Sequence, residues 1–75
     1  MITVKYFASL KERIGIAEEH VEAHGVRTVA DVWALARNAE LPPNTLVAVN
    51  QNYAGLDSAV VNGDEVAFFP PVTGG

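Results

Sequence analysis

The chain closes with Gly63-Asp64-Glu65-Val66-Ala67-Phe68-Phe69-Pro70-Pro71-Val72-Thr73-Gly74-Gly75. Its apolar run predicts a strand from Asp64 to Phe69. Because successive strand residues point to opposite faces, Val66 and Phe68 share one face whereas Phe69 points to the other. A helix on one side of a sheet can bury only one of these two rings, which leaves an aromatic side chain for the open face. From the residues alone, use of that ring at an interface and its burial in the core both stay open.

The residues after this strand favour a projecting tail. Pro70 and Pro71 each fix φ and disfavour helix in the residue before them, so the approach to the chain end is held extended. Gly74 and Gly75 have no Cβ, so they can thread a narrow channel and leave the last carbonyl open to attack. The alternative is a frayed end without a role. We expect residues 70–75 to be an extended tail whose terminal carboxylate is the reactive group.

Upstream, period-two alternation predicts strands over Ile2–Phe7 and Glu18–Ala23, and the apolar run Leu46–Val49 predicts a short buried strand. Helical spacing predicts a short helix from Ala8 to Ile14 that Gly15 ends.

The main helix is predicted from Val29 to about Asn38, with Thr28 as its N-cap and Asp31 in the capping-box position. Its apolar residues form one stripe: Val29, Val32, Trp33, Leu35 and Ala36. Turns are expected at residues 42–44 and 50–52, and Asn62-Gly63 is expected to form a hairpin-type turn into the last strand.

These elements predict an α+β domain, residues 1–75, with no room for a second core. The first and last strands are the most apolar, so they are expected at the centre of a mixed sheet. One main helix across a face of such a sheet is the β-grasp arrangement.

Composition narrows the function. The net charge of −4, from five basic and nine acidic residues, argues against a nucleic-acid binder and favours a partner with a basic docking surface. The chain has no cysteine, so no side-chain thiol can carry sulfur. Neither a signal peptide nor an apolar run of the ~20 residues that span a bilayer is present, which indicates a soluble cytoplasmic protein without membrane contact.

Other candidate sites have simpler explanations. His20 and His24 lie in or beside a predicted strand, where four residues span about 13 Å, so the pair cannot close on one ion and no metal site is expected. Asp57 and Ser58 have no histidine near them in sequence, and a small domain offers little scaffold for a catalytic pocket.

The closing stretch resembles the C-terminus of the molybdopterin synthase small subunits, the MoaD family. Three further segments are similar to that family: Ile2-x-Val4-x-x-Phe7-Ala8, Leu10-Lys11-Glu12-Arg13-Ile14-Gly15 and Val47-Ala48-Val49-Asn50-Gln51. The resemblance implies a ubiquitin-like β-grasp fold and a sulfur carrier that is not an enzyme on its own. It implies that an E1-like adenylyltransferase (MoeB-like) makes an acyl-adenylate of Gly75 with ATP and magnesium, and that a sulfur donor protein then gives a thiocarboxylate.

The resemblance further implies a heterotetramer with the large synthase subunit (MoaE-like). The tail is expected to enter a pocket of that subunit and to deliver sulfur to cyclic pyranopterin monophosphate. The molybdopterin dithiolene results, and the catalytic residues belong to the large subunit. Insertion is expected to involve Gly74, Thr73, Val72, Pro71 and Pro70.

Docking is expected to involve Phe69, Phe7 and Lys11, although Lys11 could equally be a solvated surface lysine. Three alternatives remain at this point. These are a sulfur carrier for thiamine or another thiolation, a ubiquitin-like protein modifier, and an interaction module with an accidental Gly-Gly.

Overall fold

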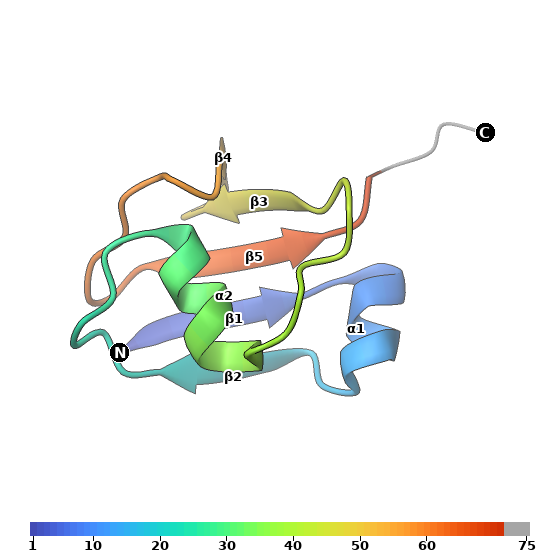
Figure 1. The fold of residues 1–75 in the computed structure, drawn as a ribbon, viewed down its shortest axis with the longest axis horizontal. Coiled ribbons are helices and arrows are strands. Elements are labelled where there is room, and N and C mark those ends of the chain that lie inside the picture. The colour runs from blue at the N-terminus through green and yellow to red at the C-terminus, as the bar shows by residue number, and fades with distance from the viewer. Residues whose placement is uncertain (72–75) are drawn as a thin grey trace.

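The computed structural model describes residues 1–71 and contains five strands and two helices. In chain order they are β1 (Ile2–Tyr6), α1 (Ala8–Ile14), β2 (Glu18–Val21), α2 (Val29–Arg37), β3 (Leu46–Val49), β4 (Asn52–Ala54) and β5 (Glu65–Phe69). The sheet order is β2-β1-β5-β3-β4, as Figure 1 shows. β1 and β5 are parallel and the other pairs are antiparallel. The predicted α+β class and mixed sheet are therefore confirmed, and β5 is its central strand.

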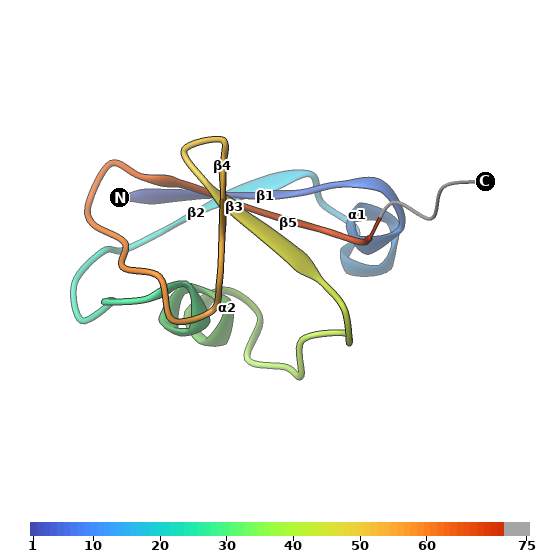
Figure 2. The ribbon, with the colours of Figure 1, turned by 90° about the horizontal axis from the view of Figure 1, so that it is seen from above.

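The helix α2 lies across one face of the sheet, and Figure 2 shows the opposite face without a helix over it. The core lies between α2 and the sheet. It contains the predicted inward faces of the central strands, since Ile2, Val4, Val66 and Phe68 are fully buried. Sequence alternation thus identified which side of β1 and β5 faces the helix.

An aromatic cluster lies within this core. The ring centroids of Trp33 and Phe68 are 5.0 Å apart, and those of Tyr6 and Phe68 are 6.2 Å apart. The indole Nε1 of Trp33 donates a hydrogen bond to the carbonyl oxygen of Ala39 at 2.6 Å, so its polar atom is satisfied. Trp33 is a core residue, as the helix stripe predicted.

A polar network closes the core at its β2 side. The Tyr6 hydroxyl donates to Glu19, and Glu19 pairs with Arg37 of α2 at 2.9 Å. Burial, followed by the hydrogen bond to Glu19, raises the pKa of Tyr6 far above its ordinary value of 10.0. The guanidinium of Arg37 also lies 5.6 Å from the centre of the Tyr6 ring. The network joins β1, β2 and the last turn of α2.

The start of α2 and the end of α1 are capped as the sequence predicts. Thr28 and Asp31 form the capping box, with the Asp31 amide donating to the Thr28 hydroxyl and the Thr28 amide donating to the Asp31 carboxylate. Gly15 closes α1 at φ 94°, a left-handed conformation that glycine adopts without strain.

Three sequence predictions in the first half of the chain need correction. Leu35 is 54% exposed, because at about 100° per residue it lies roughly a third of a turn away from the buried stripe of α2. The second strand ends at Val21 rather than Ala23, and the first ends at Tyr6 because Phe7 is already the N-cap of α1.

The remaining corrections concern the second half of the chain. A strand was missed at Asn52–Ala54, which pairs with β3 through a tight turn in which Asn50 and Gln51 have φ of 50° and 70°. The Asn62-Gly63 turn exists, but it does not form a hairpin. The chain before it pairs with no part of β5, whose neighbours are β1 and β3. Within residues 1–71, no helix has the length and apolarity needed to cross a membrane.

Candidate functional site at the end of the central strand

The predicted docking residues gather where β1 and β5 end. The two strands run parallel with Tyr6 opposite Phe68, so Phe7 and Phe69 follow at neighbouring strand ends. The Phe7 amide donates to the Phe68 carbonyl at 3.2 Å, which ties the start of α1 to β5. Figure 1 shows α1 and the end of β5 on the same side of the molecule. Pro70 and Pro71 follow directly and are the last residues that the structure describes.

Phe7 and Lys11 are both exposed at this end. Phe7 is 48% exposed although it is a large apolar residue, and its carbonyl accepts the first helical hydrogen bond, from the Lys11 amide at 3.2 Å. Ala8, between them, has φ 52°, a left-handed conformation that costs a non-glycine residue about 1–2 kcal/mol. The backbone therefore turns sharply after β1.

Phe69 lies on the open face and is half-buried. Its ring centroid is 6.1 Å from that of Tyr53 on β4, and it pairs in register with Leu46 of β3. Tyr53 is 82% exposed and Leu46 is 36% exposed. We call Phe69, Tyr53 and Leu46 the open-face apolar patch.

The rest of the open face is charged. Lys5 of β1 pairs with Glu65 of β5 at 2.9 Å, and the hydrogen bond to Glu65 raises the pKa of Lys5 above its ordinary value. On β2, His20 lies 3.9 Å from the Glu18 carboxylate. Apolar and charged residues are thus divided along the sheet, with the apolar part over β3, β4 and the end of β5.

The patch contains two residues that sequence reasoning missed, Tyr53 and Leu46. Tyr53 was missed because its strand was read as a loop. The signal was present: Asn50-Gln51 can adopt the left-handed turn that joins two adjacent strands, and Asn52-Tyr53-Ala54 follows it directly. Leu46 was assigned to a buried strand, whereas only Val47 of that strand is fully buried.

The expected tail residues lie mostly outside the described part of the chain. Pro70 is half-buried and Pro71 is exposed, both without regular secondary structure. Val72, Thr73, Gly74 and Gly75 fall outside residues 1–71, so their predicted roles stay predictions.

The other candidates behave as surface groups. His20 and His24 are exposed, and residues 1–71 contain no group of three His, Cys, Asp or Glu side chains that could hold a metal. The Ser58 hydroxyl accepts a hydrogen bond from the Gly55 amide at 2.9 Å and so helps to form a turn.

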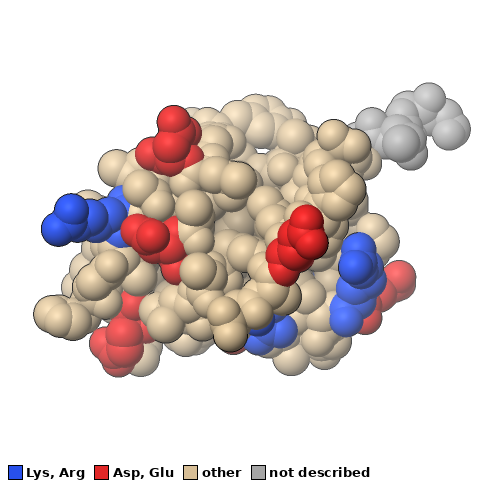
Figure 3. Space-filling view, in the orientation of Figure 1, with Lys and Arg blue, Asp and Glu red and all other residues tan. Residues whose placement is uncertain are grey.

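Charges are dispersed on the helix-covered side, where Figure 3 shows acidic groups spread between a few basic ones and no continuous basic surface. Such a surface does not suit phosphate-backbone binding.

The sequence of this chain is similar to a known protein family and to known proteins. The model of the ThiS family matches residues 4–75. The chain is 44% identical to the molybdopterin synthase sulfur carrier subunit of Haemophilus influenzae and 39% identical to that of Escherichia coli, and each alignment covers 100% of both chains.

Solved structures give the same fold. The crystal structure of SAMP1 from Haloferax volcanii matches with a TM-score of 0.79 and 32% identity over 99% of this chain and 98% of that one. A complex of subunits 1 and 2 of molybdopterin-converting factor from Helicobacter pylori contains a chain with a TM-score of 0.69, at 22% identity over 99% and 97% of the two chains. These matches confirm the ubiquitin-like β-grasp fold.

Proposed function

Because this chain belongs to the ThiS family, and within it to the sulfur carrier subunits of molybdopterin synthase, we propose that the carboxylate of Gly75 carries the sulfur as a thiocarboxylate. The chain is the non-catalytic carrier subunit of the synthase. The observation that supports the proposal most directly is the match to two curated sulfur carriers over the whole of both chains.

Composition supports the C-terminal carboxylate as the group that carries the sulfur. The sequence has no cysteine, so a persulfide on a side chain is not possible. An ionised carboxylate is a poor electrophile, so an E1-like enzyme would first join it to AMP from ATP, with magnesium, and release pyrophosphate. Sulfide-level sulfur from a sulfur donor would then displace AMP to leave the thiocarboxylate. Since this activation consumes ATP, the proposed compartment is the cytoplasm.

Residues 70–75 are proposed as the tail of a single domain that the large synthase subunit receives in a pocket. Glycines at 74 and 75 suit a narrow entrance because they lack a Cβ. The acceptor is proposed to be cyclic pyranopterin monophosphate, and the catalytic acids and bases are proposed to belong to the large subunit, in a heterotetramer.

Docking is proposed to use Phe7, Lys11 and the open-face apolar patch. These groups surround the point where the tail leaves the domain, and the patch exposes aromatic area that a monomer would not need. A solved complex joins subunits 1 and 2 of the converting factor in Helicobacter pylori, and its smaller chain has this fold. By analogy, we propose the corresponding large subunit as the principal partner.

The test is reconstitution of the synthase from the thiocarboxylated chain, the large subunit and the pterin precursor. Deleting Gly75, or replacing Gly74 with Trp, should abolish dithiolene formation while the thermal transition stays unchanged. Phe69→Ala should weaken large-subunit binding by about tenfold or more, as loss of an aromatic interface anchor does. Leu56→Ala, which removes an exposed leucine away from the patch, is the matched control. Product formation by the Gly75 deletion would overturn the proposal.

Similarity to SAMP1, a small archaeal modifier protein, favours one second candidate, conjugation to lysines of other proteins. Isopeptide-linked Gly75 adducts in host cells would support conjugation. If the same cells contain the thiocarboxylate but no such adducts, sulfur carriage is the only role supported.

A further inference from the structure

The outer edge of β2 lies at the opposite end of the sheet from β4. β2 ends the sheet, and among residues 1–71 no strand pairs with its outer side. The register with β1 places Val4 opposite Glu19 and Ile2 opposite Val21. An unpaired edge presents backbone donors and acceptors to any extended chain that approaches it.

The hydrogen-bonding pattern identifies the free groups. The Tyr6 amide donates to the Ala17 carbonyl at 2.9 Å, so Ala17 turns its backbone groups toward β1. Alternation then turns those of Glu19 toward β1 as well. The amides and carbonyls of Glu18 and His20 point outward, which provides two donors and two acceptors in one row.

Charge along this edge selects the partner. Glu18 and Glu22 are exposed, and Asp31 lies at the start of the neighbouring helix. Of the three basic residues nearby, Lys5 pairs with Glu65 and Arg37 pairs with Glu19, and Arg27 is the third. A second copy of this chain would bring like charges together across the new strand pair, which is destabilising. A segment rich in Lys or Arg would instead meet opposite charges.

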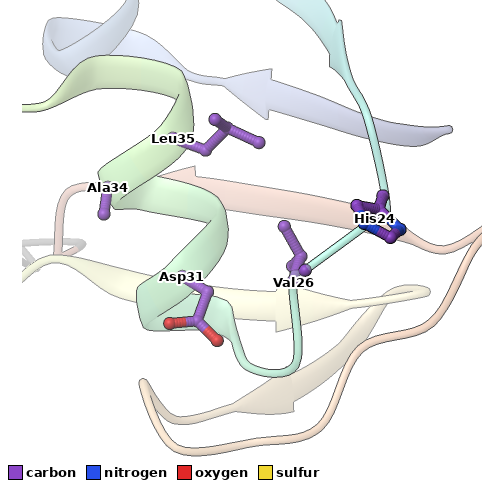
Figure 4. A pocket seen from close by; sticks show the side chains of 6 residues that line it. His24, Val26, Asp31, Ala34 and Leu35 are labelled. Carbon is purple, nitrogen blue, oxygen red and sulfur yellow. The ribbon is translucent and has the colours of Figure 1, made fainter.

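A hollow just beyond the end of β2 offers a place for an apolar side chain. It has a volume of about 330 Å³ and lies between α2 and the segment that follows β2. Figure 4 shows Leu35, Ala34 and Asp31 on α2, with Val26 and His24 on the segment that precedes the helix. Leu35 is the member of the predicted stripe that the core leaves exposed, so its apolar surface is available here.

We propose that the outer edge of β2 binds a basic, extended peptide segment of a partner protein, which adds as a strand and places one apolar side chain in the hollow. Backbone hydrogen bonds from Glu18 and His20 would give affinity, and the hollow and the carboxylates would give specificity, as in other cases of strand addition. The edge and the open-face apolar patch lie on different parts of the molecule, so both could be occupied together.

The test uses the full chain, labelled with ¹⁵N, and the capped peptide Lys-Val-Lys-Leu-Lys-Val-Lys. Saturating peptide should slow amide hydrogen exchange at Glu18 and His20 by about tenfold or more, because newly paired amides become protected. The same peptide with alternate backbone amides N-methylated keeps its side chains but loses donors, and it should fail to protect them. A Glu-Val-Glu-Leu-Glu-Val-Glu peptide should not bind.

Variants separate the two parts of the surface. Leu35→Ala should weaken peptide binding several-fold, whereas Leu56→Ala, an exposed leucine outside the hollow, should leave it unchanged. Glu18→Gln with Glu22→Gln should weaken binding and flatten its dependence on salt. Equal binding of the N-methylated peptide would overturn the proposal. Peptide-induced changes in amide chemical shift that are confined to the open face of the sheet would overturn it as well. So would protection of the same amides that grows with protein concentration in the absence of peptide, since it would indicate a second copy.

Discussion

Phe68 and Phe69 provide a paired test of the account, because they are adjacent, chemically identical and assigned opposite roles. Phe68 is fully buried, with ring centroids of Trp33 and Tyr6 at 5.0 and 6.2 Å. Truncating a buried phenylalanine to alanine costs about 3–5 kcal/mol. A domain of this size usually has only about 3–5 kcal/mol of stability, so Phe68→Ala should lose most or all of its stability at 25 °C.

Phe69→Ala should remain folded. Its ring is half-buried, and its aromatic neighbour is Tyr53, which is 82% exposed. Loss of that pair costs about 1 kcal/mol, which lowers the melting temperature by roughly 4–8 °C. Urea unfolding followed by far-ultraviolet circular dichroism and by Trp33 fluorescence measures both variants. Similar destabilisation by the two substitutions would refute the assignment of opposite faces, as would a Phe68→Ala variant that is as stable as the parent chain.

Three further predictions concern the scaffold. Thr28→Ala removes the hydroxyl that accepts from the Asp31 amide, and it should lower the free energy of unfolding by about 1 kcal/mol in urea titrations. The hydrogen bond from Asn50, followed by that from the Val61 amide, holds the pKa of Asp64 below its ordinary 3.8. The Asp64 carboxylate therefore stabilises the fold above pH 3.8, and this contribution is lost as the pH falls through the lower pKa of the folded state. Asp64→Asn should flatten this acid dependence of the melting temperature. Gly63→Ala should destabilise by about 1–2 kcal/mol, because a side chain at φ 96° is strained even with open space around it, and calorimetry would measure the change.

The sequence predicted most of the fold because its strongest signals are local. Alternation in β1 and β5 separated buried from exposed residues, and the cap at Thr28 marked the start of α2 correctly. Leu35 was misplaced because a short helix buries a narrower stripe than its apolar residues suggest.

The site was only partly predictable. Phe7 and Phe69 are distant in sequence, yet both were expected among the docking residues, and the structure brings their strand ends together. Tyr53 could not be added without the pairing of β3 with β4, a non-local contact that depends on two residues in left-handed turn conformations. The free edge of β2 likewise follows from the sheet order, which local patterns do not encode.

The most direct test of the central claim is the intact mass of the purified chain after incubation with its host's activating enzyme, ATP and a sulfur source. The account predicts a gain that matches replacement of one oxygen by sulfur, and fragmentation should map it to Gly75. A chain lacking Gly75 should show no gain. An unchanged mass, with the enzymes shown to be active on another carrier, would contradict the assignment of Gly75 as the sulfur carrier.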